Sequence, residues 1–343
     1  MLKNSLYEGN SIEILKEIPK NHVQLAYLDP PFFTNRSHES NNPNGRISFD
    51  DIWKNGIDEY LQFMKEILTE SLRILDSKGA LFLHCDWHAV HYLKVELDKI
   101  FGYHNFRNEI IWVRHNSQNN HKQGAKIFGR MHDTILFYSK SSAYTWNQPY
   151  EKYSEEYVKK AYRNTDKDTG EHYALGDLSG PGGASKGNPY FEFMGFTRYW
   201  RYNEEKMNEL FEEGKIIQTR PGTVPKLKRY LKDMKGVPLS DIWTDIQNDQ
   251  TKRNDTAIYP TQKSLELLDR IIRCSTNPGD LVLDAFCGSG STLIVAQNAN
   301  RKWIGIDVNP QAIQATKLRL KQHGILESEF HIVHSTNPFL KQT

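Results

Sequence analysis

An acid, two prolines and a phenylalanine follow one another in Asp29-Pro30-Pro31-Phe32, directly after the apolar run Val23–Leu28. The Asp29 carboxylate is a hydrogen-bond acceptor. Pro31 biases Pro30 towards an extended backbone, which can aim the Pro30 carbonyl as a second, rigid acceptor. Phe32 adds a flat apolar face. These groups suit a planar ligand with an exocyclic amino group, such as a nucleobase edge; an ordinary rigid turn is the alternative.

A second motif lies near the other end of the chain. The buried-strand pattern Leu281–Phe286 runs into a turn containing Gly288 and Gly290, and a helical pattern follows. Such a turn lets a ligand approach the backbone and meet a helix N-terminus. The strand pattern Trp303–Asp307 then ends in an acid about twenty residues past the glycines, where a ribose-binding carboxylate belongs. Leu293 replaces the third glycine of the dinucleotide fingerprint, which argues against NAD.

Together these motifs resemble those of the site-specific adenine-N6 and cytosine-N4 DNA methyltransferases, which use S-adenosylmethionine. A catalytic motif that precedes the cofactor motif is typical of their β group, and the resemblance covers about residues 4–140 and 236–320. Tyr259–Lys263 resembles the segment that supports the methionine end of the cofactor, and Gly9–Ser11 the segment near its adenine. Many members carry Asp where this chain has Asn10, an amide without charge.

The resemblance implies a role for each matching residue. Asp29 and Pro30 would accept hydrogen bonds from the amino group of the target base, while Pro31 fixes the turn and Phe32 stacks on the base. On the cofactor, Asp307 would accept from the ribose hydroxyls. Lys263 and Thr292 are candidates for its carboxylate. The residues predicted to bind the cofactor are Asn10, Ser11, Asp29, Thr261, Lys263, Asp284, Phe286, Gly288, Gly290, Ser291, Thr292 and Asp307.

This chemistry needs alignment more than covalent catalysis, because the methyl group is displaced directly from a sulfonium. The target amino group is paired inside the duplex, so the base must be extruded first. Methylation at cytosine C5 would instead need a cysteine nucleophile, usually after a proline. None of Cys85, Cys274 and Cys287 follows a proline.

Four functions remain open, and adenine-N6 methylation of duplex DNA leads them. The second is cytosine-N4 methylation of DNA. The resembling enzymes with that activity usually carry Ser in place of Asp29, so the acid in this chain favours adenine as the target base. Adenine-N6 methylation of RNA is the third. The fourth is a nucleic-acid-binding protein that has lost catalysis, against which the intact motifs argue.

The composition is that of a globular protein. The chain has 343 residues, 38% hydrophobic and 25% charged, with a net charge of +2 that is too small to indicate a nucleic-acid partner by itself. Three cysteines make no disulfide framework and indicate a reducing compartment, so we expect a cytoplasmic protein, associated with the nucleoid when bound to DNA. The N-terminus shows no secretory signal, and we see no apolar segment of membrane-spanning length.

Strand and helix patterns alternate along the chain, which predicts an α/β fold with a mainly parallel, doubly wound sheet. The resemblance specifies a Rossmann-like S-adenosylmethionine-dependent methyltransferase fold of seven strands, one of them reversed. The further predicted strands are Ala80–His84, Phe106–Val113 and Thr134–Tyr138, and the helices are Ile57–Leu75, Tyr92–Ile100 and Glu266–Ile272.

The alternation stops between about residues 141 and 238. We therefore expect a catalytic domain in two parts, 1–140 with the Asp-Pro-Pro-Phe motif and 239–343 with the cofactor motif, around an inserted domain, 141–238. The insertion holds an aromatic-rich stretch, Tyr190–Tyr202, most of which we expect to form its own small core. The resemblance implies that this insertion is the target-recognition region.

Two polar loops are candidates for DNA contact. Asn35–Arg46 follows the catalytic motif and could close over an extruded base, and Arg114–Lys126 is rich in side chains that bind phosphates and adenine edges. A solvated loop is the alternative for both. The candidate DNA-binding residues are Arg36, Arg46, Arg114, Asn116, Lys122, Lys126, Arg198, Arg201, Lys228 and Arg229.

Double-stranded DNA is the expected partner, and we expect no membrane partner. The resemblance also implies two possible protein partners, a cognate restriction endonuclease and a second copy of the chain in a homodimer, and the sequence establishes neither. His84, His88 and His91 invite a metal site, but they lack a carboxylate or cysteine in a zinc-like register, so we expect no metal.

Overall fold

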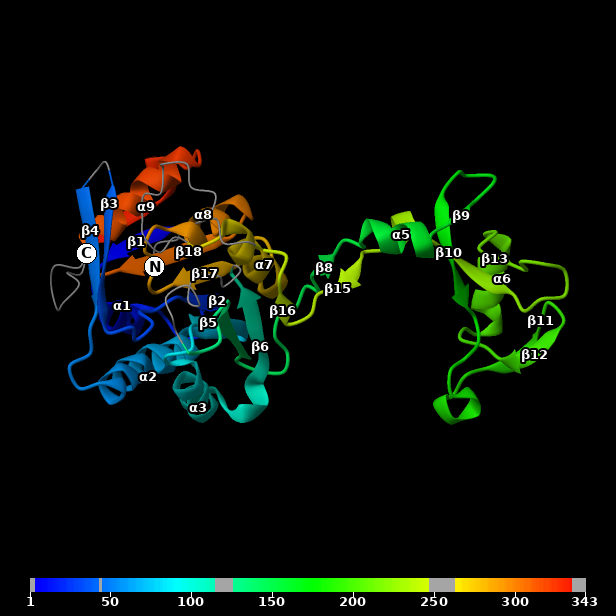
Figure 1. The fold of residues 1–343 in the computed structure, drawn as a ribbon, viewed down its shortest axis with the longest axis horizontal. Coiled ribbons are helices and arrows are strands. Elements are labelled where there is room, and N and C mark those ends of the chain that lie inside the picture. Colours follow the sequence, from blue (N-terminus) through cyan, green and yellow to red (C-terminus); the bar gives the residue numbers. More distant parts are fainter. Residues whose placement is uncertain (1–3, 43–44, 115–125, 247–262, 335–343) are drawn as a thin grey trace. The chain divides into compact units, whose positions relative to one another are not determined.

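The computed structural model describes residues 4–42, 45–114, 126–246 and 263–334. Their contacts divide the chain into two compact units (Figure 1). The first unit consists of Met1–Pro149 and Ser240–Thr343, and the second unit is Tyr150–Leu239. The second unit is therefore an insertion in the sequence of the first.

A nine-stranded sheet forms the centre of the first unit, in the order β16-β6-β7-β5-β2-β17-β18-β1-β19. Neighbouring strands are parallel except at β7, which is antiparallel to both β5 and β6. The strands are β1 (Ser5–Glu8), β2 (Val23–Leu28), β5 (Leu75–Cys85), β6 (Phe106–Val113), β7 (His132–Ser139), β16 (Ile242–Trp243), β17 (Leu281–Asp284), β18 (Lys302–Asp307) and β19 (His331–His334).

The expected α/β fold with a mainly parallel sheet and one reversed strand is confirmed, but the sheet has nine strands where seven were predicted. The additional strands are β16 and β19, which lie at its two edges. At two and four residues they are too short to show a recognisable alternation in the sequence, and they form by pairing with β6 and β1.

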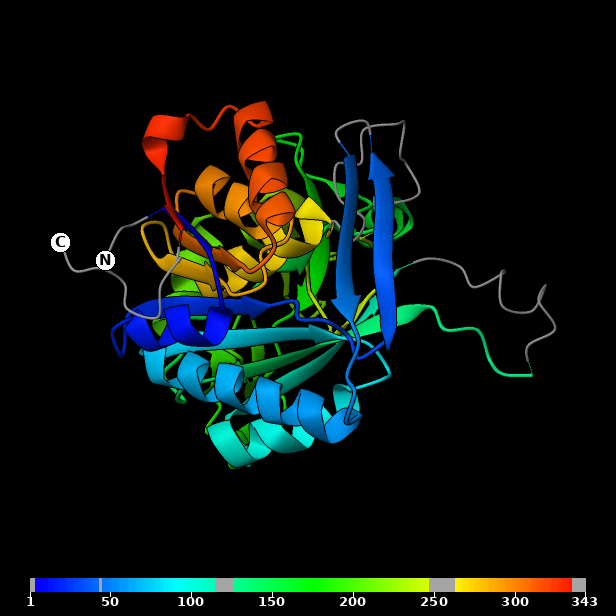
Figure 2. The ribbon, with the colours of Figure 1, turned by 90° about the vertical axis from the view of Figure 1, so that its left-hand side faces the viewer.

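Helices cover both faces of the sheet. In Figure 2, α1 (Ser11–Glu17), α2 (Ile57–Ile74) and α3 (Val90–Phe101) lie on one face, and α8 (Ser291–Asn298) and α9 (Pro310–Gln322) on the other. Helix α7 (Leu265–Ser275) packs against α8. The helical spacing of apolar residues that predicted α2 forms its buried stripe, to which Tyr60, Met64, Ile67, Leu68 and Ile74 belong.

The segment predicted as a polar loop, Asn35–Arg46, is instead largely part of a β-hairpin. Strands β3 (Arg36–Asn42) and β4 (Gly45–Asp51) pair antiparallel, with Arg36 opposite Asp51 and Asn42 opposite Gly45. The two strands project from the first unit as a ribbon (Figure 2). The prediction was wrong because β3 has almost none of the β-branched and aromatic residues that mark strands, so its conformation comes from pairing with β4.

The second unit has its own core. A four-stranded antiparallel sheet, β13-β14-β10-β9, a hairpin of β11 and β12, and the helix α6 (Glu204–Glu212) belong to it. Its remaining elements are α5 (Glu155–Ala161), β8 (Tyr150–Glu151), β9 (Asn164–Thr165), β10 (His172–Asp177), β11 (Tyr190–Phe193), β12 (Phe196–Tyr199), β13 (Ile216–Ile217), β14 (Lys226–Tyr230) and β15 (Val237–Pro238).

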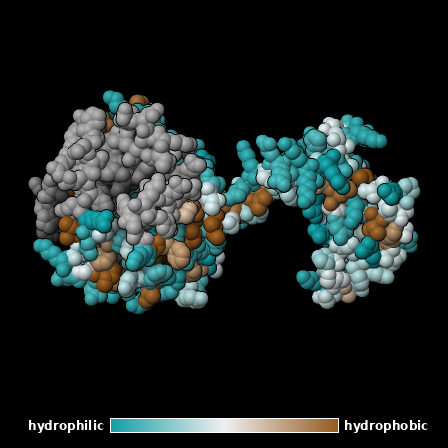
Figure 3. Space-filling view, in the orientation of Figure 1, coloured by the Kyte–Doolittle hydropathy of each residue, from teal (hydrophilic) through white to brown (hydrophobic). Residues whose placement is uncertain are grey.

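Aromatic side chains of the stretch Tyr190–Tyr202 divide between this core and the surface. Phe193 and Trp200 are buried among apolar residues of β12–β14 and α6, with Phe191, Phe196 and Tyr202 packed against them, whereas Tyr190 is exposed. The face of the second unit seen in Figure 3 is mostly hydrophilic, with apolar side chains in small separate areas. Among the described residues, no helix is both long and apolar enough to cross a membrane.

Candidate active site

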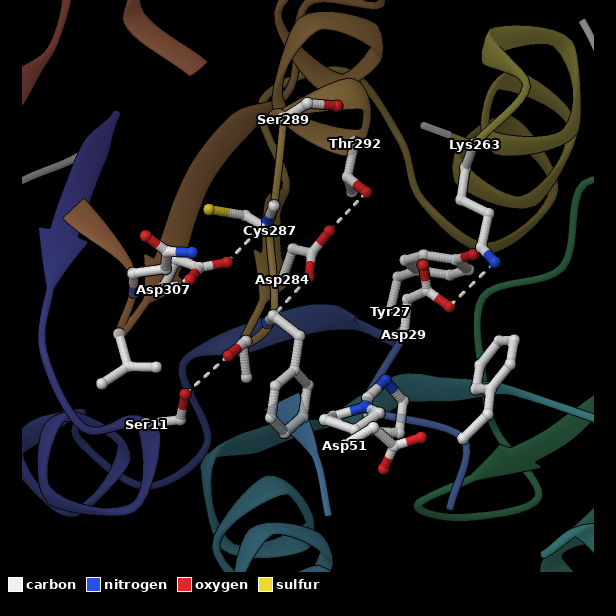
Figure 4. Close-up of a pocket in the computed structure, with 18 of the residues that line it drawn as sticks. Ser11, Tyr27, Asp29, Asp51, Lys263, Asp284, Cys287, Ser289, Thr292 and Asp307 are labelled. Atoms are coloured by element: carbon white, nitrogen blue, oxygen red, sulfur yellow. Dashed lines mark hydrogen bonds and ion pairs between the residues drawn. The ribbon is translucent and has the colours of Figure 1, made fainter. Parts of the chain in front are cut away.

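The carboxyl ends of three adjacent parallel strands, β2, β17 and β18, meet at one edge of the sheet and border a cavity of about 310 Å³. This is the edge at which open α/β sheets bind ligands. Each strand brings one acid to the cavity: Asp29 just after β2, Asp284 at the end of β17 and Asp307 at the end of β18. Figure 4 shows the three carboxylates side by side.

Most of the residues predicted for catalysis or cofactor binding line this cavity. They are Asn10, Ser11, Asp29, Pro30, Pro31, Phe32, Lys263, Asp284, Phe286, Gly288, Ser291, Thr292 and Asp307. Thr261 lies outside the described residues. The lining residues that sequence analysis missed are Tyr27, Thr34, Asp51, Phe63, Ala285, Cys287, Ser289, Val308 and Asn309.

The glycine turn between β17 and α8 holds the carboxylate of Asp307. The backbone N–H of Gly288 donates to Asp307 Oδ2 at 2.8 Å, and that of Asn309 donates to Oδ1 at 2.8 Å. Burial raises the pKa of Asp307 to about 6, against the opposing effect of these hydrogen bonds. Gly290 caps α8 with φ +76°, and a Cβ there would lie 2.6 Å from Thr316 Cγ2, so the turn requires glycine.

Asp284 is oriented by its own turn. It accepts hydrogen bonds from Thr292 Oγ1 at 2.5 Å and from the backbone N–H of Phe286 at 3.0 Å. Burial raises its pKa to about 7. Because the Thr292 hydroxyl donates to Asp284, its visible role is to hold this carboxylate.

Asn10 is the N-cap residue of helix α1, and this role explains why Asn can stand where many family members have Asp. Its Oδ1 accepts from the N–H of Ile12 at 2.8 Å, a role that Asn and Asp perform equally well. The adjacent Ser11 hydroxyl donates to the carbonyl of Ala285 at 2.6 Å, which ties α1 to the turn after β17. Both residues border the cavity.

Lys263 contacts Asp29. Its Nζ lies 3.1 Å from Asp29 Oδ1 and 4.7 Å from the centre of the Phe32 ring. The ion pair lacks hydrogen-bond geometry, so the buried Oδ1 atom accepts no hydrogen bond from any residue that the structure describes. Its partner is the Lys263 ammonium, which a ligand N–H could replace at this acceptor. Figure 4 shows the Lys263 side chain reaching towards Asp29.

A buried polar chain lies behind Phe32. The Phe32 ring stacks on His84 with the ring centres 5.7 Å apart. Burial lowers the pKa of His84, so the imidazole is neutral at pH 7. Its Nδ1 lies 3.0 Å from the Tyr27 hydroxyl and its Nε2 3.2 Å from Asp133 Oδ2, which together assign the proton to Nε2. Asp133 in turn pairs with Arg114 at 3.3 Å.

His84 therefore supports an aromatic ring of the cavity, whereas the sequence had raised it only as a metal ligand. Its neighbour along the chain, His88, pairs instead with Asp86 at 2.7 Å. A polar ring that directly follows the apolar run Ala80–Leu83 of β5 was the available signal. Within the described ranges, metal-binding groups of three or more His, Cys, Asp or Glu are absent.

The DNA-binding candidates are scattered over both units. Arg36, Lys126 and Arg201 are exposed. Arg114 is paired with Asp133, and Lys228 with Asp166 at 2.7 Å, so both charges already have internal partners. Arg198 lies over the Trp200 ring, and Arg229 lies across Gly176. Arg46 belongs to β4, and Asn116 and Lys122 lie outside the described residues.

An open, mainly parallel sheet with a glycine turn and an acid at each of three strand ends defines a Rossmann-like class that binds nucleoside-containing ligands. The model of the DNA methylase family N6_N4_Mtase matches residues 23–318, and the chain belongs to this family. The family depends on S-adenosylmethionine, the cofactor that the sequence predicted.

Individual relatives agree with this assignment. The type II methyltransferase M.EcaI of Enterobacter cloacae is 34% identical over 95% of this chain and 70% of its own length. The DNA adenine methyltransferase YhdJ of Escherichia coli (strain K12) is 27% identical over 92% of this chain and 82% of its own length. The predicted resemblance to DNA methyltransferases is thus confirmed.

Two solved structures show the same fold. The putative DNA modification methylase TTHA0409 of Thermus thermophilus, complexed with S-adenosyl-L-methionine, has a TM-score of 0.52 at 18% identity and covers 97% of this chain and 99% of its own. The cytosine-N4-specific PvuII DNA methyltransferase has a TM-score of 0.54 at 16% identity, with 97% and 96% covered. Adenine and cytosine-N4 enzymes both occur among these proteins, so family membership alone does not specify the base.

Proposed function

We propose that the protein transfers a methyl group from S-adenosylmethionine to N6 of an extruded adenine in a specific sequence of duplex DNA. The observation that carries the proposal is the carboxylate of Asp29, which borders the cavity beside Phe32 and whose buried Oδ1 is held by an ion pair and not by a hydrogen bond. An acid at this position distinguishes the chain from the resembling cytosine-N4 enzymes, which usually carry Ser there.

We assign one side of the cavity, formed by Asp284, Gly288 and Asp307, to the cofactor and call it the cofactor side. When bound, S-adenosylmethionine supplies a methyl group on a positively charged sulfonium. The residues present fit this group: Gly288 opens the backbone to a ligand, and Asp307 is an oriented acceptor for ribose hydroxyls. Two buried carboxylates, Asp284 and Asp307, also make the local potential favourable for a cation.

The other side of the cavity, Asp29–Phe32, receives the base, and we call it the acceptor side. Hydrogen bonds from N6–H to Asp29 Oδ1 and to the Pro30 carbonyl would localise the nitrogen lone pair towards the methyl group. His84 stacks on Phe32, and the Lys263 ammonium lies 4.7 Å from the centre of the same ring, so we expect the base to take the place of this ammonium at the ring. The Lys263 ammonium therefore leaves Asp29 when the base enters.

We assign target recognition to the second unit, Tyr150–Leu239. Its separate core and its exposed basic residues, such as Arg201, support this assignment. Double-stranded DNA is then the macromolecular substrate. A cognate restriction endonuclease, a homodimer and a cytoplasmic location stay predictions.

Mass spectrometry of nucleosides tests the proposal. Purified protein is incubated with unmethylated DNA and S-adenosylmethionine, and the DNA is digested to nucleosides; the control reaction contains Asp29→Ala. We expect N6-methyldeoxyadenosine in the digest with the wild-type protein and none with the variant. N4-methyldeoxycytidine would overturn the base assignment, and methylation of RNA but not of DNA would overturn the substrate.

A further inference from the structure

Asp51, at the end of strand β4, directs its carboxylate at the turn that follows the Asp29–Phe32 motif. The side chain is buried, with 1% of the residue surface exposed. Its Oδ2 accepts from the backbone N–H of Thr34 at 2.6 Å and from the Thr34 hydroxyl at 2.7 Å. Its Oδ1 accepts from the backbone N–H of Phe33 at 3.2 Å and from Trp53 Nε1 at 2.8 Å. One carboxylate thus collects four donors around a single turn.

The turn needs such a partner because its backbone is unfavourable. Phe33 has φ +61° and Asn35 has φ +52°, in the left-handed region. Asn tolerates this region, but a bulky residue such as phenylalanine is an outlier there and persists only where its surroundings hold it. Residues in this conformation cluster at ligand sites, and Phe33 directly follows Phe32 of the acceptor side.

Aromatic side chains hold the same turn from another direction. The Phe33 and Trp53 rings both contact Tyr60 of helix α2, with ring centres 5.6 Å and 5.1 Å away. The backbone N–H of Trp53 donates to Asn35 Oδ1 at 3.2 Å. Asp51 also faces Arg36 in the β3–β4 ladder, so the stem of the hairpin and the turn form one hydrogen-bonded structure.

We propose that Asp51 is a positioning residue for methyl transfer: by holding Phe33 in its left-handed conformation, it fixes the directions of the Pro30 carbonyl and the Phe32 ring. The proposal rests on the function proposed above, because those two groups receive the base. Asp51 borders the cavity, but donors of the turn engage both of its oxygens, which makes it a support and not a general base.

The variant Asp51→Asn tests this role. The amide has the shape of the carboxylate but turns one acceptor oxygen into an NH2 donor, which then faces donors of the turn. We expect kcat for DNA methylation to fall by about 100-fold, the effect of a small misplacement of reacting groups. The dissociation constant of S-adenosylmethionine, measured by calorimetry, should stay at the wild-type value, since none of the four donors that Asp51 engages belongs to Asp284, Gly288 or Asp307 of the cofactor side.

Asp98→Asn is the matched control for a loss of stability alone. Asp98 accepts hydrogen bonds from the Tyr138 hydroxyl at 2.6 Å and from Lys94 Nζ at 2.7 Å in the same unit, and it does not border the cavity. Its variant should lower the melting temperature and leave kcat at the wild-type value. Amide hydrogen exchange at Phe33 and Thr34 should be faster in Asp51→Asn only.

A rescue variant shows whether Asp51 acts through the backbone of Phe33. Glycine adopts positive φ without steric cost, so Phe33→Gly added to Asp51→Asn should restore part of the lost kcat. Wild-type kcat in Asp51→Asn, or a loss of kcat without faster amide exchange at Phe33 and Thr34, would overturn the proposal. If the wild type itself methylates nothing, the proposed function fails and the positioning role fails with it; an active wild type confines the failure to Asp51.

Discussion

The cofactor side and the acceptor side of the cavity are held by different kinds of contact. On the cofactor side, Asp307 and Asp284 are oriented largely by backbone N–H groups that lie within a few residues of them or in the adjoining glycine turn. On the acceptor side, the turn after Asp29 is held by side chains from elsewhere: Asp51 of the hairpin, Tyr60 of α2, and Lys263 before α7.

This difference has a consequence for function. A loop whose own backbone satisfies its carboxylates is preorganised before a ligand arrives. The acceptor side, in contrast, carries an ion pair that the incoming base must replace. We therefore expect substitutions on the two sides to separate cofactor binding from methyl transfer.

The largest expected effect comes from Asp29→Ala. Removal of this acceptor should lower kcat on the order of 100- to 1,000-fold, the usual size of one preorganised electrostatic contact in a transition state. Methyl incorporation into DNA under saturating cofactor measures it. Asp98 lies away from the cavity, so Asp98→Asn is the control. A comparable fall in kcat in this variant would show that any weakened fold lowers the rate, and the assignment of Asp29 as the acceptor for the base would then be wrong.

Asp307→Ala should act on the other side. The variant loses an acceptor for ribose hydroxyls and the partner of the Gly288 N–H. Hydrogen bonds to a charged group are worth about 1.5–3 kcal/mol, so the dissociation constant of S-adenosylmethionine should rise about 10- to 100-fold. With saturating cofactor, kcat should recover towards the wild-type value. A kcat that stays low at saturation would contradict the division into two sides.

A smaller effect should appear in the pH dependence of cofactor binding. Burial raises the pKa of Asp307 to about 6 and that of Asp284 to about 7, so the folded protein without cofactor holds protons that the unfolded chain releases near pH 4. These groups therefore make the free energy of unfolding fall as pH rises from about 4 to 7. Binding of a cation and of hydroxyl donors favours the ionised forms, so affinity should increase over about pH 5.5 to 7.5.

Calorimetry across this pH range checks the prediction, with Asp307→Asn as the comparison. The amide does not ionise, so the part of the pH dependence centred near pH 6 should be missing in that variant. An identical pH profile in the wild type and in Asp307→Asn would refute the role given to this group.

The sequence predicted the cofactor side better than the supports of the acceptor side. Asp29, Asp284 and Asp307 each end an apolar strand pattern, and parallel strands bring their carboxyl ends to one edge, so local patterns suffice to bring them together. Gly288 and Gly290 likewise mark a turn directly in the sequence.

The acceptor side depends on contacts that no local pattern reveals. Tyr27, His84 and Asp133 come from three strands whose order in the sheet must be known before their side chains can be placed together. Asp51 ends a hairpin whose first strand, β3, resembled a polar loop, because β3 acquires its conformation from pairing and not from its composition. The motif of Lys263 suggested a cofactor contact, and its ion pair with Asp29 could not be predicted from that motif.

The division of the cavity into a cofactor side and an acceptor side is tested by titrating S-adenosylmethionine into Asp29→Ala and into Asp307→Ala under one buffer condition. Circular dichroism shows whether both variants are folded. We expect wild-type affinity for Asp29→Ala and a dissociation constant raised about 10- to 100-fold for Asp307→Ala. Equal loss of affinity in the two folded variants would contradict it, because the cavity would then bind the cofactor as one site without an acceptor side of its own.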